Sequence, residues 1–183
     1  MRGEAVVSDT RGSGVQQIIV SGIGGQGVLF ATRLLAETAL ALGHSIMISE
    51  THGMAQRGGN VISHLKVGHS GLVSPLIRPG QADVFLGLHP DSFMVHGFYL
   101  KESGRAFCNG STGACHCSLE ATSIAIELGA PVAANLVLLG FAAASGFLFC
   151  HREDVAAQLT RFGGNRQELN LKAFRAGVAA FPP

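Results

Sequence analysis

The chain alternates between short apolar runs that favour β-strands and longer segments with helical periodicity. The β-branched runs predict buried strands over residues 17–21, 45–49 and 82–88, an alternating strand over 61–67 and a weaker strand over 105–109. Apolar residues at helical spacing predict helices over residues 28–42, 118–128, 135–150, 152–162 and 167–180. This alternation predicts an α/β fold, with three α/β/α layers around a mostly parallel, Rossmann-like sheet.

The same pattern predicts the domain organisation. Residues 1–15 are rich in Gly, Ser and Asp, which predicts a flexible leader. No internal repeat or linker-like run interrupts residues 16–183, and a chain of 183 residues is long enough for a sizeable core. We therefore predict a single α/β domain after a short leader.

Composition adds the expectation of a covered surface. The chain is 47% hydrophobic and only 14% charged, with 13 basic and 12 acidic side chains and a net charge of +1. An ordinary soluble domain is about 25% charged. A folded monomer of this size exposes about 8,000 Å² of surface, which so few charges cover thinly. We expect a partner to cover part of this surface, and we exclude a disordered chain and a nucleic-acid-binding protein.

The cysteines bear on the compartment and on metal binding. No apolar run typical of a signal peptide occurs before residue 17, so we expect a cytoplasmic protein with free thiols. The four thiols belong to Cys108, Cys115, Cys117 and Cys150. Cys115 and Cys117 flank His116, but zinc and cluster sites usually place two or more residues between paired cysteines. No metal site is therefore predicted.

One uncharged stretch, residues 132–150, is long enough to raise the possibility of a membrane span. Asn135, Gly140, Ser145 and Gly146 interrupt it, and no aromatic belt or basic cluster flanks it. We therefore expect a helix from 135 to 150 that is buried in the core and against a partner subunit, and no membrane contact.

The turn after the first predicted strand carries a glycine motif. Gly22, Gly24 and Gly27 fit the pattern G-x-G-x-x-G between a strand and a helix, and Glu50 follows at the end of the second strand. Glycines at these positions let a phosphate approach the backbone and the helix N-terminus. Such a turn also serves close packing of strand and helix, so both interpretations remain open.

A second glycine-rich segment covers residues 50–60. It follows the second predicted strand, so a parallel sheet brings it beside the first glycine turn. Arg57 offers a planar set of donors for a carboxylate, a phosphate or an acidic partner group, and His52 is a second donor. The alternative is a solvated Arg next to a turn-forming Gly58-Gly59 pair, but the density of polar and glycine residues favours contact.

Other motifs are missing from the sequence. It contains no phosphate-binding G-x-x-x-x-G-K-[ST] loop and no G-x-S-x-G nucleophile elbow. None of the eight histidines pairs with another at helical metal-binding spacing. We identify no catalytic residue, which suits a helper subunit better than a free-standing enzyme.

The motifs resemble a known family, the gamma-type subunits of the 2-oxoacid:ferredoxin oxidoreductases. The segment GMAQRGG is most similar to the small (beta) subunit of indolepyruvate:ferredoxin oxidoreductase. The similarity extends from about residue 17 to residue 177, whereas residues 106–119 do not match. The segments that carry it are 23–28 (IGGQGV), 53–59 (GMAQRGG), 74–77 (SPLI), 82–84 (ADV) and 168–177 (ELNLKAFRAG).

The resemblance implies a role in the CoA-dependent oxidative decarboxylation of a 2-oxoacid, such as indolepyruvate, an aryl-pyruvate or a related ketoacid, with electrons passed to ferredoxin. It places thiamine diphosphate, Mg²⁺ and the iron–sulfur clusters on a large catalytic subunit, so the chain alone is expected to be inactive and to bind no cofactor firmly. The residues expected to face a ligand or that subunit are Gly22, Gly24, Gly25, Gln26, Gly27, Glu50, His52, Gln56, Arg57, Gly58, Gly59 and Asn60.

Two alternatives remain open from the residues alone. The first is an NAD(P)-dependent dehydrogenase domain, in which the first glycine turn holds the pyrophosphate and Glu50 holds the ribose. The second is a non-catalytic adaptor that binds an acidic or nucleotide ligand or scaffolds another protein.

Overall fold

The structure is a computed structural model that describes residues 14–52, 59–110, 115, 117–162 and 164–182. The predicted leader lies outside these residues except for Gly14 and Val15, so the leader and its boundary stay predictions. The elements, in chain order, are β1 (Gln16–Ile23), α1 (Val28–Ala41), β2 (Ser45–His52), β3 (Asn60–Gly68), β4 (Ala82–Gly87), α2 (Ser92–His96), η1 (Gly97–Tyr99), β5 (Leu100–Asn109), β6 (Cys117–Leu119), α3 (Ala121–Glu127), η2 (Pro131–Ala133), α4 (Ala134–Ala144), α5 (Arg152–Phe162), η3 (Gly164–Arg166) and α6 (Gln167–Ala180).

The described strands form one sheet in the order β2-β3-β1-β4-β5-β6. Five of them run in one direction, and β3 runs antiparallel to both of its neighbours, β1 and β2. β1 lies at the centre, where Ile18, Ile19 and Val20 are fully buried, as a strand covered on both faces requires. The predicted α/β fold with a mostly parallel sheet is therefore confirmed.

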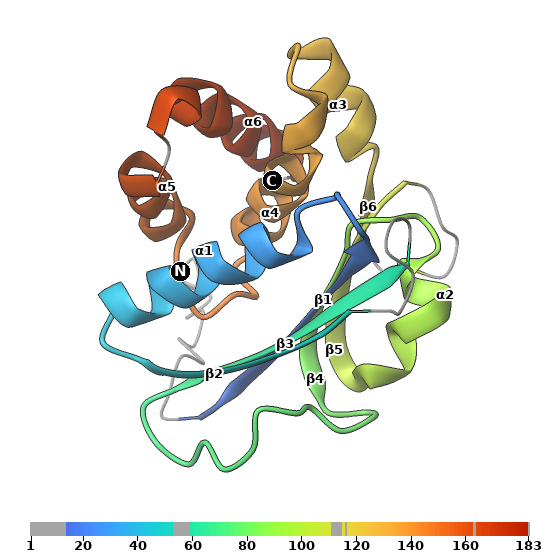
Figure 1. Cartoon of the computed structure of the whole chain (residues 1–183), viewed down its shortest axis with the longest axis vertical. Coiled ribbons are helices and arrows are strands. Elements are labelled where there is room, and N and C mark those ends of the chain that lie inside the picture. Colours follow the sequence, from blue (N-terminus) through green and yellow to red (C-terminus); the bar gives the residue numbers. More distant parts are fainter. Residues whose placement is uncertain (1–13, 53–58, 111–114, 116, 163, 183) are drawn as a thin grey trace, which may run out of the picture.

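One face of the sheet carries a thick helical layer made of α1 and α3 to α6 (Figure 1). α4 lies at its centre, and its residues from Asn135 to Ala143 are all buried. α4 and α6 approach so closely that a Cβ at Gly140 or Gly177 would overlap backbone atoms of the other helix. Most of the large buried side chains belong to the core on this face.

The opposite face has a thinner cover, which consists of the short helix α2, the turn η1 and residues 69–81 (Figure 1). Its core cluster is small and is centred on Phe85, with Ile77 packed from the loop and Cys108 from β5. Phe93 of α2 stacks edge-on against Phe85 at 5.4 Å between ring centroids. The two outer layers of the three-layer fold are thus unequal.

The long helix predicted over 135–150 is wrong at its C-terminal end. α4 ends at Ala144, and Ser145 accepts a hydrogen bond from the Phe147 backbone N–H at 3.2 Å, which turns the chain out of the helix. The chain's own elements bury residues 135–143, which leaves this part no surface for the expected subunit contact, whereas Phe147 is exposed and a contact there stays a prediction. None of the helices in the described part of the chain is both long enough and apolar enough to cross a membrane.

Smaller differences concern element boundaries and one missed strand. β2 extends through Glu50 to His52, so the predicted loop starts later than expected. β5 is twice as long as predicted, and β6 occupies the start of the segment predicted as a helix from 118. β6 was missed because three residues are too short to show a periodicity. The helices predicted over 152–162 and 167–180 are confirmed at both ends.

Candidate functional site at the carboxyl edge of the sheet

The two glycine segments meet at one edge of the sheet. β1 and β2 both end there and β3 begins there, because β3 pairs with both strands in the antiparallel direction. The backbone N–H of Gly24 donates to the carbonyl oxygen of Gly59 at 3.1 Å. The predicted neighbourhood of the two segments is therefore confirmed by a direct hydrogen bond.

Gln26 holds the first glycine turn in shape. Its backbone N–H donates to the Ile23 carbonyl at 3.2 Å, and its side-chain Oε1 accepts from the Ile23 N–H at 3.0 Å. A Cβ at Gly22 would lie only 3.0 Å from that oxygen and 3.0 Å from Val28. The roles of Gly22 and Gln26 within the described residues are therefore structural.

Gly27 and Gly25 both have a positive φ, but their surroundings differ. Gly27 has a φ of 78°, and a Cβ there would overlap the amide of Asn135, which donates to the Gly27 carbonyl at 3.3 Å. Gly25 has a φ of 94° and no described atom within 4 Å of the Cβ position. Close packing of α4 therefore explains Gly27, whereas no contact with a described residue explains Gly25.

The N-terminus of α1 opens at the same edge. Gly27 occupies the N-cap position, no described side chain caps it, and the first turn contains no acidic residue. The amides of this first turn have no partner within the helix, so the helix dipole leaves a local positive potential at the edge. This potential favours a negatively charged or carbonyl group from outside the chain.

The position of Glu50 contradicts the dinucleotide-binding alternative. In a Rossmann unit the second strand lies directly beside the first, so that its terminal carboxylate reaches the ribose. Here β3 separates them: Glu50 pairs with Ser63, and Ser63 pairs with Val20 of β1. The extra strand moves Glu50 about 4.8 Å further from the glycine turn.

The remaining predicted site residues are only partly described. Asn60 is exposed at the start of β3 and pairs with Ile23. His52 ends β2, and its side chain is outside the described part. Gln56, Arg57 and Gly58 lie outside the described residues. Their expected contacts therefore stay predictions.

Two polar connections at this edge were not predicted. The Asn109 amide, at the end of β5, donates to the Leu88 carbonyl at 3.0 Å and to the Thr122 hydroxyl at 2.8 Å. Ser21 and His96 are joined by a hydrogen bond of 2.8 Å between Oγ and Nδ1, and burial lowers the pKa of His96. Ser21 and Asn109 are polar residues at the ends of apolar strand runs, and this pattern in the sequence could have indicated the two connections.

The cysteines differ from the expected free thiols. Cys108 and Cys115 are joined in a disulfide with a Cα–Cα distance of 6.3 Å, next to the carboxyl end of β5. Cys117 and Cys150 are free, as expected. Burial raises the pKa of Cys150 to about 12, so it is present as an unreactive thiol. The pairing could not be predicted because it depends on how the chain returns to β5 after Asn109.

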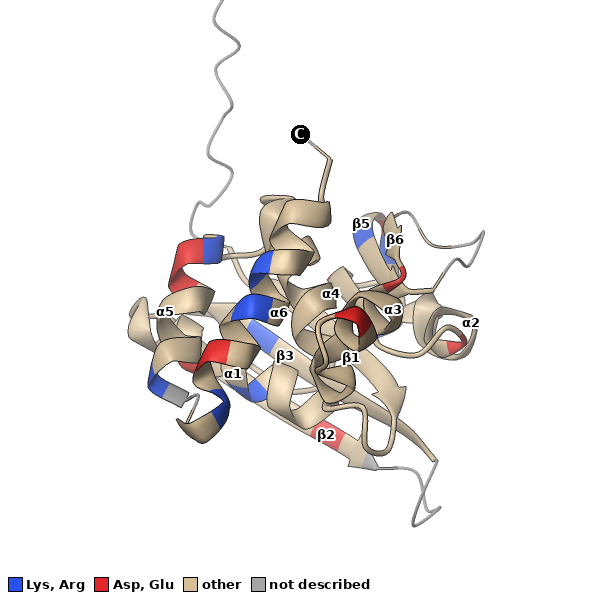
Figure 2. Ribbon diagram, turned by 90° about the horizontal axis from the view of Figure 1, so that it is seen from above, with Lys and Arg blue, Asp and Glu red and all other residues tan. Residues whose placement is uncertain are grey.

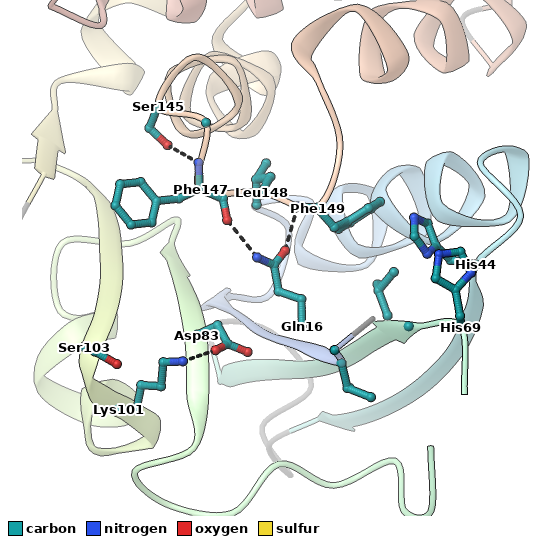
Figure 3. A pocket seen from close by; sticks show the side chains of 15 residues that line it. Gln16, His44, His69, Asp83, Lys101, Ser103, Ser145, Phe147, Leu148 and Phe149 are labelled. Atoms are coloured by element: carbon teal, nitrogen blue, oxygen red, sulfur yellow. Dashed lines mark hydrogen bonds and ion pairs between the residues drawn. The ribbon is translucent and has the colours of Figure 1, made fainter. Parts of the chain in front are cut away.

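A pocket of about 540 Å³ lies at the opposite edge, where β1 and β4 begin (Figure 3). The side chain of Gln16 spans its floor, donating to the Phe147 carbonyl at 2.7 Å and accepting from the Phe149 N–H at 2.8 Å. Lys101 and Asp83 form an ion pair in its wall. None of the predicted site residues lines this pocket. We interpret its polar lining as structural, because Gln16 there holds the backbone of residues 147 and 149.

Comparison with known proteins gives the family. The chain is 31% identical to indolepyruvate oxidoreductase subunit IorB of Pyrococcus horikoshii and 28% identical to that of Thermococcus kodakarensis, each alignment covering 89% of this chain and 94% of the relative. The solved gamma subunit of a keto/oxoacid ferredoxin oxidoreductase from Geobacter sulfurreducens has a TM-score of 0.72 and 25% identity, over 90% of this chain and 96% of that one. Residues 17–180 match the family described as pyruvate ferredoxin/flavodoxin oxidoreductase, and the chain belongs to this family, which confirms the resemblance found in its glycine motifs.

Proposed function

We propose that this chain is the small, gamma-type subunit of a 2-oxoacid:ferredoxin oxidoreductase that acts on indolepyruvate or a related aryl-pyruvate or ketoacid. It works only together with a larger catalytic subunit, which carries out the CoA-dependent oxidative decarboxylation and passes electrons to ferredoxin. Family membership and the names of the relatives support this proposal.

The observation that carries the proposal is the hydrogen bond between Gly24 and Gly59. It joins the first glycine turn to the end of the second glycine segment at the carboxyl edge, and no described atom lies within 4 Å of the Cβ position of Gly25. Glycine-rich backbone without side chains permits the close approach of another chain or of a ligand. We assign this edge to the contact with the larger subunit.

The cofactors implied by the activity belong, in this proposal, to the larger subunit. An iron–sulfur cluster is usually held by four cysteine thiolates. Here Cys108 and Cys115 are joined in a disulfide, and Cys150 is a buried thiol. In the described part of the chain, no three His, Cys, Asp or Glu side chains come together to hold a metal ion. The described residues therefore do not fit an iron–sulfur cluster or a metal ion.

Co-expression tests the function. The chain is produced with and without its cognate larger subunit, and 2-oxoacid- and CoA-dependent reduction of ferredoxin is measured. We expect no turnover from the chain alone and turnover from the assembled complex. Turnover by the isolated chain, or full activity of the larger subunit without it, contradicts the proposal.

A matched pair of glycine variants tests the assigned edge. Gly25 and Gly43 have similar positive φ values, 94° and 80°, and both have open space around the Cβ position. Gly25→Leu and Gly43→Leu therefore carry the same backbone strain, about 1–2 kcal/mol each. We expect assembly with the larger subunit to weaken at least tenfold only in Gly25→Leu, measured by titration with the purified subunit. Equal assembly of both variants contradicts the assignment.

A further inference from the structure

A groove of about 680 Å³ lies on the thin face, between residues 71–81 and the neighbouring strands β1 and β3. Val73 and Leu76 contribute apolar side chains to it, while Lys66 and Arg78 contribute the charged ones. None of the described residues that line it is acidic. We call this site the basic groove; it is separate from the glycine edge, because none of the predicted site residues lines it.

Hydrogen bonds on the inner side of residues 71–81 fix the loop that forms the groove. Ile77 is buried, and its backbone N–H donates to Nδ1 of the buried His64 at 3.2 Å. The Gly80 N–H donates to the Phe98 carbonyl at 2.9 Å, which joins the loop to η1. His64 in turn stacks edge-on with Tyr99 at 5.1 Å between ring centroids. A surface anchored in this way loses little conformational entropy when a partner binds.

Large apolar side chains around the groove face solvent. Val73 is 89% exposed and Phe98 is 57% exposed, and Leu76 is also more than half exposed. The hydrogen bond from Gly80 to Phe98 places Phe98 next to the loop that carries Val73 and Leu76. Exposed clusters of this kind are typical of protein–protein contact sites, and an aromatic side chain is a frequent anchor in them.

The two cations of the groove have no acidic partner in the described chain. Arg78 is exposed and Lys66 is partly buried, and neither takes part in an ion pair. A second copy of this chain docked through the same surface would bring these like charges together. A partner segment with a carboxylate would instead neutralise them. The charge pattern therefore selects an acidic partner over self-association.

The described helices α4, α5 and α6 suit a partner less well. Residues 135–143 of α4 are buried, and charged residues of both signs gather on α5 and α6 (Figure 2). The glycine edge, with Leu29 and Phe30 exposed beside it on α1, carries the contact already proposed, and the groove adds further area and anchors to it.

We propose that the basic groove is a second docking surface for the larger catalytic subunit, and that it receives a polypeptide segment in which a carboxylate is flanked by apolar side chains. This proposal rests on the proposed function and adds a contact to it. The carboxylate pairs with Lys66 and Arg78, and the apolar side chains cover Val73, Leu76 and Phe98.

Charge reversal in the assembled protein tests the docking surface. The variant Lys66→Glu/Arg78→Glu is compared with Arg161→Glu/Arg166→Glu, which changes the net charge equally at exposed positions on α5 and η3. Assembly with the larger subunit is measured by titration, and thermal unfolding checks folding. We expect the first variant to weaken assembly at least tenfold, the second to leave it within about twofold, and both to keep the unfolding midpoint.

Two further variants separate charge from apolar contact. Lys66→Arg/Arg78→Lys keeps the charges and is expected to assemble like the wild type. Val73→Ser/Leu76→Ser removes the apolar anchors and is expected to weaken assembly about tenfold while both cations remain. Wild-type assembly is also expected to weaken with added NaCl, because salt screens the charge pairing.

The outcomes distinguish this inference from the proposed function. Failure of the wild-type chain to assemble with the larger subunit overturns the proposed function and the inference together. Normal wild-type assembly with a normal Lys66→Glu/Arg78→Glu variant overturns only the docking surface. Two other results also overturn the docking surface. In the first, the wild-type chain forms a homodimer, and Val73→Ser/Leu76→Ser dissociates it. In the second, the isolated chain binds inorganic phosphate in a calorimetric titration, and Lys66→Glu/Arg78→Glu abolishes this binding.

Discussion

The two faces of the sheet are built in different ways. On one face, α4 packs against α6 with backbone in direct contact, and the elements around it bury residues 135–143 of α4. On the other, a five-residue helix, a single 3₁₀ turn and a loop cover a small cluster and leave Val73 and Phe98 exposed. The thick face holds most of the large buried side chains and is expected to supply most of the stability, while our proposal places a partner on the thin face.

The largest effect is expected at the α4–α6 crossing. Gly177→Ala places a methyl group on the carbonyl oxygen of Val137, a backbone atom that cannot rotate away. The helices must separate, and we expect the free energy of unfolding to fall by about 3 kcal/mol or more. Urea titration followed by circular dichroism measures this change.

The control for Gly177→Ala lies on the same helix. Ala179 is exposed, so Ala179→Ser is expected to change the free energy of unfolding by less than about 0.5 kcal/mol. Equal effects of the two substitutions would show that close helix packing is not what stabilises the thick face.

An intermediate effect is expected from the disulfide beside the thin face. Cys108 belongs to the small cluster, and its bond to Cys115 closes a short loop. A loop of this length restricts the unfolded chain by about 2 kcal/mol. We therefore expect dithiothreitol to lower the free energy of unfolding by that amount in the wild type and to have no effect on Cys115→Ser. A wild-type protein that is insensitive to the reductant contradicts this role.

The smallest effect is a pH dependence that arises on the thin face. Burial lowers the pKa of His64 and of His96, and for His64 the nearby His96 and Lys66 lower it further. Below about pH 6.5, where a histidine in the unfolded chain becomes protonated, the unfolded state therefore binds more protons. The free energy of unfolding is therefore expected to be highest above that pH and to decrease as the pH falls below it.

Urea titrations at pH 7.5, 6.5 and 5.5 measure this dependence. The double variant His64→Gln/His96→Gln removes the two shifted groups of the thin face and is expected to reduce the slope over this interval, while the lowered pKa of His44 keeps part of it. An unchanged slope in the variant would assign the pH dependence to residues outside the thin face.

Most elements could be predicted from local sequence. α5 and α6 were predicted to the residue, because an apolar stripe runs along each and Pro182 follows α6. The end of α1 was predicted within one residue because Gly43, with a φ of 80°, terminates it. α4 was predicted too long, because the loop of residues 145–150 is as free of charge as the helix before it, so composition does not mark the end of the helix.

The candidate site was predicted in outline. The position of Gly24 beside Gly59 followed from two strands that end at one edge of the sheet. The bond from Asn135 to Gly27 joins residues far apart in the chain, so no local pattern could indicate it. It shows that Gly27 serves helix packing, which the glycine pattern alone left open.

The sequence by itself determined the class of fold, the main helices and strands, and the family, because these depend on residues close together along the chain. Only the tertiary structure decided that β3 lies antiparallel between β1 and β2, that Cys108 pairs with Cys115, and that the two faces are unequal. These features depend on contacts between distant segments, and an alternating strand pattern specifies which face is buried but not which strand lies beside it.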